Sequence, residues 1–293
     1  MTIDWREKRF TGADGTRLYY RVTGQPGQPW AILSDGIGCD GYMWRYIIPQ
    51  LVTNGYRVLH WNYPGHGFSD RAAPPQTLTI EFFAAPLIKL CRELDVTDPL
   101  VLGHSMGVQV NLQALRDGLS ARGLVIIFGA AGRVLDQYGG NDRLGRYLPA
   151  LRVALKSQKS LFEVIWKHAM PTRFGLAVGL MTELNAMRIR PIDFMPYLER
   201  LSQMDPEDFL AVLAQAAEHD ARPWLMDVRV PALVLAGDSD SFTPPRLSRS
   251  MHKTLPDSRL VVIEGASHAG PLEFPDECNQ ALQAYLDELA SAP

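Results

Sequence analysis

The clearest chemical signature in the chain is the pentapeptide Gly103–Gly107 (GHSMG), which has Ser105 at its centre. The apolar stretch Leu100–Leu102 precedes it, and a helical pattern starts near Met106. A sharp turn from strand to helix strains the backbone of the serine, so the flanking positions must lack side chains that would collide. The N-H groups and dipole of the new helix favour negative charge beside the serine. We therefore expect Ser105 to be a nucleophile held above a sheet edge.

A serine hydroxyl is a weak nucleophile near neutral pH, so it needs an adjacent base that a carboxylate orients. Two later loops carry such groups, each directly after a short apolar stretch. Asp238 and Asp240 follow Ala232–Ala236, and His268 follows Arg259–Ile263. If these stretches are strands of one sheet, the hydroxyl, the imidazole and a carboxylate meet at its edge. This arrangement predicts acyl transfer to water.

Short apolar stretches alternate with segments of helical periodicity, which is typical of a mostly parallel sheet covered by helices. The predicted strands are Leu18–Val22, Trp30–Leu33, Arg57–Trp61, Leu100–Leu102, Leu124–Phe128, Ala232–Ala236 and Arg259–Ile263. The predicted helices are Met43–Thr53, Ile80–Leu94, Met106–Asp117, Pro245–Leu255 and Asp276–Leu289. The fold class is therefore α/β, with a mostly parallel central sheet flanked by helices.

The alternation breaks over residues 133–225, where prolines separate several helical stretches and no convincing strand is visible. We expect residues 1–132 and 226–293 to form a core domain and residues 133–225 an inserted helical cap. Its clearest helix has Asp205 as N-cap and Pro206 at the first helical position. Large apolar side chains are frequent in the insert, which suits either a pocket lining or plain packing on the core. They are Phe162, Trp166, Met170, Phe174, Met181, Met187, Phe194, Met195 and Met204.

With these motifs the chain resembles the α/β-hydrolase superfamily over nearly its whole length. The resemblance is carried by the serine pentapeptide, the segment Asn62–Asp70 and the loops Gly237–Asp240 and Gly265–His268. It implies an α/β-hydrolase fold with a helical cap, and a serine hydrolase of the esterase or lipase type. It also implies that the acid is Asp240 rather than the earlier carboxylate of the same loop. Some members place the acid after the preceding strand, which leaves Asp136 as the second candidate.

The oxyanion hole of such an enzyme needs two backbone N-H donors aimed at the tetrahedral intermediate. Met106, directly after the serine, offers one of them. The resemblance implies the N-H of Ile37 as the other, because Ser34–Gly38 stands where the family carries H-G-x-G. Asp35 takes the place of the histidine in that motif, and a carboxylate beside an oxyanion would oppose catalysis. We therefore expect its side chain to point away into hydrogen bonds of the loop.

The remaining histidines and cysteines are expected to be structural. His66 and Ser69 lie in a turn that shapes the sheet edge, and His104 is expected to support the serine turn. The histidines lack metal-ligand spacing, so we expect no metal and no cofactor. Cys39 lies close to the oxyanion loop, but nothing nearby would activate its thiol. Three cysteines far apart in the sequence suit reduced thiols better than disulfides.

Charge and hydropathy along the chain argue against nucleic-acid and membrane partners. The formal charge of -3 is spread along the chain without a basic stripe, which argues against nucleic acid. The charged N-terminus lacks the apolar stretch of a signal peptide, and the apolar run Phe174–Met181 is too short to cross a bilayer. We expect a soluble cytoplasmic protein that acts on a small molecule, without stable membrane insertion. The oligomeric state stays open.

The expected activity is cleavage of carboxylic esters through an acyl-enzyme on Ser105. Apolar, medium-length acyl groups are favoured, because an apolar cap suits such a pocket. A lactonase, a carbon-carbon bond hydrolase, an acyltransferase or a perhydrolase would share the same triad. Dehalogenases and epoxide hydrolases of this fold normally use an aspartate nucleophile, so the serine argues against both. An alternative of another class is a receptor that binds a small molecule with little turnover.

Overall fold

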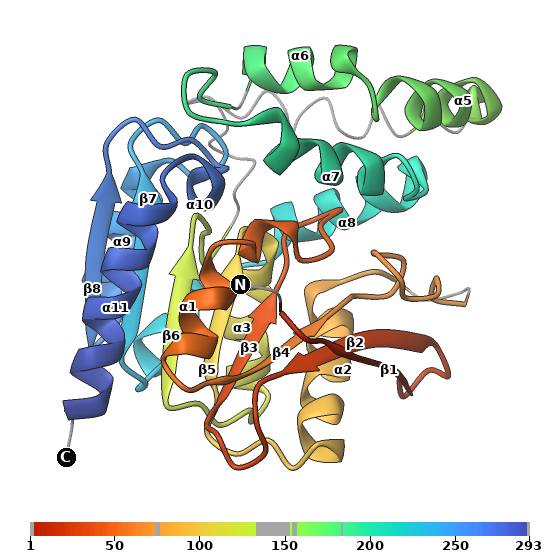
Figure 1. The fold of residues 1–293 in the computed structure, drawn as a ribbon. Coiled ribbons are helices and arrows are strands. Elements are labelled where there is room, and N and C mark those ends of the chain that lie inside the picture. Colours follow the sequence, from red (N-terminus) through yellow and green to blue (C-terminus); the bar gives the residue numbers. More distant parts are fainter. Residues whose placement is uncertain (1–2, 74–76, 133–152, 154–156, 183, 292–293) are drawn as a thin grey trace.

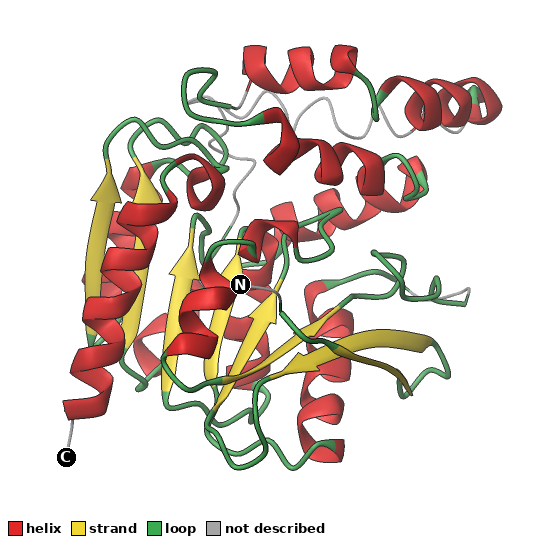
Figure 2. Ribbon diagram, in the orientation of Figure 1, coloured by secondary structure: helices red, strands yellow, loops and turns green. Residues whose placement is uncertain are grey.

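The structure is a computed structural model that describes residues 3–73, 77–132, 153, 157–182 and 184–291. Its strands are β1 (Arg6–Thr11), β2 (Arg17–Thr23), β3 (Trp30–Ser34), β4 (Arg57–Trp61), β5 (Leu100–His104), β6 (Gly123–Ile127), β7 (Ala232–Gly237) and β8 (Ser258–Ile263). The helices before β6 and after β7 are η1 (Tyr42–Trp44), α1 (Ile47–Thr53), α2 (Ile80–Glu93), α3 (Met106–Arg116), α9 (Pro245–Thr254), α10 (Gly270–Glu273) and α11 (Pro275–Ser291). Figures 1 and 2 show one twisted sheet with helices on both faces.

The strands form one sheet in the order β1-β2-β4-β3-β5-β6-β7-β8. β2 runs antiparallel to both of its neighbours, whereas all pairs from β4 across to β8 are parallel. The carboxyl ends of the parallel strands therefore lie along one edge, where the loops after β3, β5, β7 and β8 meet. The predicted fold class, a mostly parallel sheet flanked by helices, is confirmed.

Each central strand is buried on both faces. Along β5, Val101 packs in one apolar cluster with α2 and α3, whereas Leu100 and Leu102 pack in another with α1 and α11. Figure 1 shows α11 and α1 in front of the sheet and α2 behind it. Because successive side chains of a strand point to opposite faces, a doubly covered strand is apolar along most of its length. This explains why these strands read as unbroken apolar runs.

The structure differs from the predicted elements near the N-terminus. Strand β1 was not predicted, because it lies at the sheet edge and all of its residues except Phe10 are exposed. The predicted helix Met43–Thr53 is wrong in its first part, where the 3-10 turn η1 precedes a separate helix α1. Pro49 lies in the first turn of α1, where its missing N-H breaks no helical hydrogen bond.

Between β6 and β7 the chain forms α5 (Lys159–Ala169), α6 (Arg173–Thr182), α7 (Pro191–Leu201), α8 (Pro206–Glu218) and η3 (Arg222–Asp227). Figure 1 shows α6, α7 and α8 beyond the carboxyl ends of the parallel strands. At the start of α8 the Asp205 side chain accepts the Glu207 N-H at 2.8 Å, as predicted for an N-cap. Asp136, the second candidate for the acid, lies outside the described residues. Among the helices that the structure describes, none is long and apolar enough to span a membrane.

Candidate active site

The serine turn joins the central strand β5 to helix α3. Ser105 has φ 54° and ψ -119°, and its N-H donates to the Ile127 carbonyl at 3.1 Å. This left-handed conformation is strained for any residue except glycine, and the hydrogen bond to β6 helps to hold it. A Cβ atom at Gly107 would lie 2.0 Å from the Ser34 carbonyl oxygen. Glycine at this position therefore lets α3 pack directly against the end of β3.

The structure brings the predicted serine, histidine and aspartate into one hydrogen-bonded row. The Ser105 Oγ and His268 Nε2 atoms are 2.9 Å apart, and His268 Nδ1 lies 2.9 Å from Asp240 Oδ2. Asp240 lies in the loop after β7, and His268 in the loop after β8. Asp238 instead accepts the Gly265 N-H at 2.7 Å. Of the two carboxylates in the β7 loop, the structure therefore places Asp240 beside the imidazole.

The Asp240 carboxylate is 3% exposed and fully engaged as an acceptor. Its Oδ1 accepts the backbone N-H groups of Phe242 and Thr243, and its Oδ2 accepts the Thr243 hydroxyl as well as His268. Burial raises the pKa of Asp240, but the imidazole and the Thr243 donors outweigh it and hold the pKa below its usual value. An ionised carboxylate is only an acceptor, so His268 carries its proton on Nδ1. Its Nε2 then has a lone pair that can accept the Ser105 proton.

Two further side chains hold the loop that carries His268. The His104 Nε2 donates to the His268 carbonyl oxygen at 3.1 Å, and burial lowers the His104 pKa to about 3. His104 therefore stays neutral, and it holds the loop of His268 rather than the serine turn that the sequence suggested. Glu273 was not foreseen: it is 5% exposed and accepts both the N-H and the hydroxyl of Ser267. It also accepts the Asn185 N-H at 2.7 Å, which ties the histidine loop to the segment before α7.

The loop after β3 lies against the serine. A Cβ atom at Gly36 would lie 3.1 Å from the Ser105 Cβ. Ile37 and Met106 both line the cavity at the serine, and Met106 is the first residue of α3, where its N-H has no helical acceptor. The Asp35 carboxylate is 1% exposed and points away, accepting Trp44 Nε1 at 2.6 Å. This orientation agrees with the expectation from the sequence.

A cavity of about 500 Å³ opens at Ser105 and extends under the helices between β6 and β7. Among the described residues that line it, none is Asp, Glu, Lys or Arg. From the segments before β6 and after β7 the lining includes Gly36, Ile37, Cys39, Tyr42, Met43, Ser105, Met106, Gln109, Phe242, Thr243, His268 and Ala269. From the helices between β6 and β7 it includes Trp166, Met170, Phe174, Phe194, Tyr197, Leu198, Leu201, Phe209 and Leu213.

A sequence comparison identifies the family. The profile of the alpha/beta hydrolase family matches residues 33–281, which is most of the chain. The chain belongs to the α/β-hydrolase family.

Individual relatives of this hydrolase carry varied names. The magnesium-chelatase 30 kDa subunit of Rhodobacter capsulatus is 30% identical over 83% of this chain and 82% of its own. A thermophilic esterase from Thermogutta terrifontis superposes with a TM-score of 0.73 at 23% identity, covering 97% of this chain and 99% of that one. An enol-lactonase from Burkholderia xenovorans gives a TM-score of 0.75 at 22% identity, with 96% and 100% covered. These structural likenesses show the shared fold.

The sequence left pocket lining and plain packing open for the large apolar residues between β6 and β7, and their positions in this hydrolase differ. Trp166, Met170, Phe174 and Phe194 line the cavity. Met187 does not, because its side chain is 92% exposed. Phe162, Met195 and Met204 pack in apolar clusters, so for them the plain packing role holds. The Met181 side chain lies outside the described residues.

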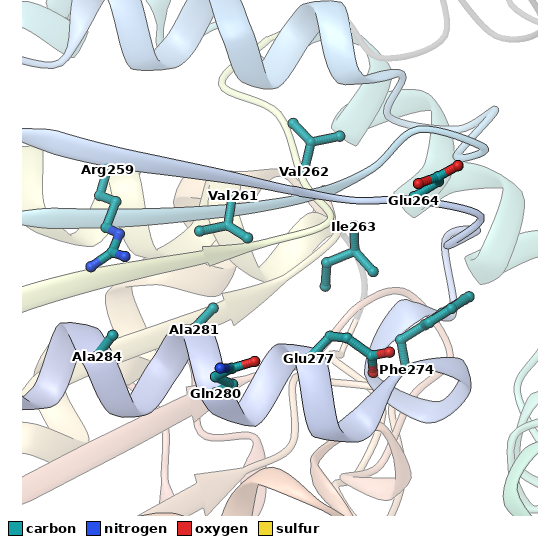
Figure 3. Close-up of a pocket in the computed structure, with 10 residues that line it drawn as sticks. All are labelled: Arg259, Val261, Val262, Ile263, Glu264, Phe274, Glu277, Gln280, Ala281 and Ala284. Carbon is teal, nitrogen blue, oxygen red and sulfur yellow. The ribbon is translucent and has the colours of Figure 1, made fainter.

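A second cavity of about 470 Å³ lies between the edge strand β8 and helix α11 of the hydrolase (Figure 3). Charged side chains such as Arg259, Glu264 and Glu277 line it together with apolar ones. None of its lining residues belongs to the row of serine, imidazole and carboxylate. The cavity at Ser105 is therefore the candidate substrate site.

The other polar residues that the sequence singles out have structural partners. The Ser69 hydroxyl donates to the Asn62 carbonyl and accepts the Tyr19 N-H, which closes the turn after β4. His66 Nδ1 donates to the Pro64 carbonyl at 3.1 Å. Burial raises the pKa of the Cys39 thiol, so this cysteine is not a thiolate at neutral pH.

Proposed function

We propose that the chain is a serine hydrolase that cleaves carboxylic esters through an acyl-enzyme on Ser105. The observation that carries this proposal is the hydrogen-bonded row in which His268 lies 2.9 Å from both Ser105 Oγ and Asp240 Oδ2. A nucleophile, a base and an orienting carboxylate in this order form the arrangement that activates a serine hydroxyl. The buried Asp240 carboxylate stabilises the imidazolium that forms when His268 takes the proton.

The reaction follows from this geometry. Ser105 Oγ attacks the ester carbonyl carbon while His268 Nε2 takes the hydroxyl proton, and the carbonyl oxygen becomes an oxyanion held by the Ile37 and Met106 N-H groups. The carbon-oxygen bond to the alcohol breaks, and His268 returns its proton to that alcohol. A water then attacks the acyl-enzyme with the same imidazole as base, which releases the acid and restores the serine.

The cavity supports a neutral, apolar acyl group as substrate. Among the described residues, its lining carries no charged side chain that could pair with a carboxylate or ammonium group, and burying such a charge unpaired is costly. Residues 133–225 are proposed to act as a cap over a core of residues 1–132 and 226–293. Trp166, Met170 and Phe174 contribute apolar surface to the acyl pocket. The cytoplasmic location stays a prediction.

A lactone is the second candidate substrate, because a lactone is an internal ester and an enol-lactonase shares this fold at a TM-score of 0.75. The test compares p-nitrophenyl esters from acetate to dodecanoate with simple lactones, using the native chain and the Ser105→Ala variant. We expect kcat/KM to increase from acetate to medium-length acyl groups and Ser105→Ala to abolish turnover. Faster cleavage of lactones would select the second candidate. Full activity of the Ser105→Ala variant would exclude the mechanism.

A further inference from the structure

A chain of hydrogen bonds leads from the antiparallel part of the sheet to the oxyanion loop. The Arg21 Nε donates to His60 Nδ1 at 3.1 Å, and His60 Nε2 lies 2.7 Å from Asp35 Oδ2. Trp44 Nε1 donates to the other oxygen, Asp35 Oδ1, at 2.6 Å. His60 is fully buried and Asp35 is 1% exposed, so water does not compete for these bonds. The proposed ester cleavage gives no role to Arg21, His60 and Asp35.

The chain of bonds has one possible direction. A guanidinium group has only donors, so His60 Nδ1 must accept from Arg21 and cannot carry a proton. A neutral His60 then carries its proton on Nε2 and donates it to Asp35, whose carboxylate accepts from both sides. Arg21 thus determines the tautomer of His60. This tautomer in turn requires a hydrogen-bond acceptor at Asp35. We call Arg21, His60 and Asp35 the relay.

The relay ends at the backbone that faces the nucleophile. The Asp35 carbonyl accepts the Tyr63 hydroxyl at 2.8 Å, so both the side chain and the main chain of Asp35 are held. The next residue, Gly36, lies so close to Ser105 that a Cβ there would approach the Ser105 Cβ to 3.1 Å. Ile37, the proposed oxyanion donor, follows directly. A shift at Asp35 therefore moves the donor relative to the serine.

We propose that Arg21, His60 and Asp35 are positioning residues that orient the Ile37 N-H through a one-way hydrogen-bond relay. The relay also keeps the Asp35 charge turned away from the oxyanion. The proposal rests on the proposed function, because its kinetic test measures ester cleavage. It explains why a carboxylate is tolerated two residues before an oxyanion donor.

The sharpest perturbation is Asp35→Asn, which keeps the shape but replaces one acceptor oxygen by a donor. Trp44 and His60 both donate to this side chain, so the new NH₂ group must face a donor. Moving the His60 proton to Nδ1 does not help, because that proton then faces the Arg21 Nε-H. We expect Asp35→Asn to lower kcat by about 10- to 100-fold with KM nearly unchanged, as for a displaced oxyanion donor.

A second substitution should rescue the first. In Arg21→Gln the amide stands the same number of bonds from the backbone as the arginine Nε, and its oxygen can accept from His60 Nδ1-H. The double variant Asp35→Asn/Arg21→Gln can therefore reverse the relay, and we expect it to recover at least about 10-fold in kcat over Asp35→Asn. Arg21→Gln alone can still donate to Nδ1 and should retain kcat within about threefold.

Arg57→Gln is the matched control. Arg57 lies over the Trp30 ring at 4.1 Å much as Arg21 lies over the Trp5 ring at 4.5 Å, but it makes no bond to the relay. Adding Arg57→Gln to Asp35→Asn should give no rescue. Full kcat in a folded Asp35→Asn variant would overturn the proposal. So would a double variant with Arg21→Gln that is no better than Asp35→Asn, or an equal rescue by Arg57→Gln.

The tautomer of His60 gives a test that needs no activity. In a long-range ¹⁵N-¹H spectrum of the native chain, with His60→Gln to identify the signals, we expect the proton on Nε2 and a bare Nδ1. A protonated Nδ1 would overturn the relay. The NMR measurement tests the relay even if Asp35→Asn does not fold. It also separates the two proposals, because loss of ester cleavage as a function would leave the tautomer result intact.

Discussion

Replacing Gly107 by alanine tests whether the serine turn and the oxyanion loop must touch as closely as they do. The added Cβ would lie 2.0 Å from the Ser34 carbonyl oxygen, 2.6 Å from the Ser34 carbonyl carbon and 2.8 Å from the Asp35 carbonyl oxygen. All three atoms are backbone, so no side chain can rotate away to relieve the overlap. Helix α3 and the end of β3 must therefore move apart.

The size of the movement follows from the contacts. Ordinary van der Waals contact begins at 3.4 Å, so the 2.0 Å approach must open by about 1.4 Å. This displacement separates the two proposed oxyanion donors, because Met106 belongs to α3 and Ile37 to the loop after β3. A misplacement of about 1 Å in an active site can cost about 100-fold in rate. We expect a loss of that order in kcat/KM, together with about 1–3 kcal/mol of unfolding free energy from overpacking.

The assay measures kcat/KM on a p-nitrophenyl ester and unfolding in urea for Gly107→Ala and for Gly118→Ala. Gly118 lies just after the other end of α3 and has φ +99°, and a Cβ atom added there would meet no atom of the described residues within 4 Å. Strain at this positive φ should cost about 1–2 kcal/mol without moving the active site. Gly118→Ala should therefore lose stability but keep its activity. A Gly107→Ala variant that folds and keeps the native kcat/KM would refute the reasoning.

Two further predictions concern the side chains around His268. Asp240→Asn should lower kcat by about 10⁴-fold, because the amide no longer keeps the proton on His268 Nδ1. Steady-state rates at pH 8 measure this loss. A loss below tenfold would contradict the prediction. The His104 pKa of about 3 in the folded chain lies below the ordinary value of 6.5. As the pH falls below 6.5, the unfolded chain therefore binds a proton at His104 that the folded chain does not. The free energy of unfolding should therefore decrease by about 2 kcal/mol between pH 7 and pH 5 through His104 alone. His104→Gln keeps a donor for the His268 carbonyl and should lose this part of the pH dependence in urea unfolding, whereas an unchanged slope would show that His104 is protonated in the folded chain.

The central sheet could be predicted from the sequence because its strands are covered on both faces. Burial on both sides favours an apolar residue at nearly every position, which gives a strong local signal in Trp30–Leu33 and Ala232–Ala236. Strand β1 lacks this signal because it is an exposed edge strand, and its pairing with β2 is set by backbone hydrogen bonds that no side-chain pattern reveals.

The candidate site was partly predictable for a similar reason. Ser105, Asp240 and His268 each follow a strand of the parallel part of the sheet, so their approach to one edge follows once the strands are parallel. Their catalytic roles remain predictions. No pattern in the sequence indicates the role of Glu273, because its partners Ser267 and Asn185 come from different parts of the chain. Long-range hydrogen bonds of this kind depend on tertiary packing and leave no periodic pattern.

The hydrolytic role of the serine is tested most directly with a fluorophosphonate probe, which reacts only with an activated hydroxyl. Peptide mapping by mass spectrometry should find one label per chain, on Ser105, in the native protein. Ser105→Ala should take up no label, and His268→Ala should react far more slowly because the base is missing. A folded native chain that stays unlabelled, or that is labelled at another residue, would contradict the account and favour a binding protein over an enzyme.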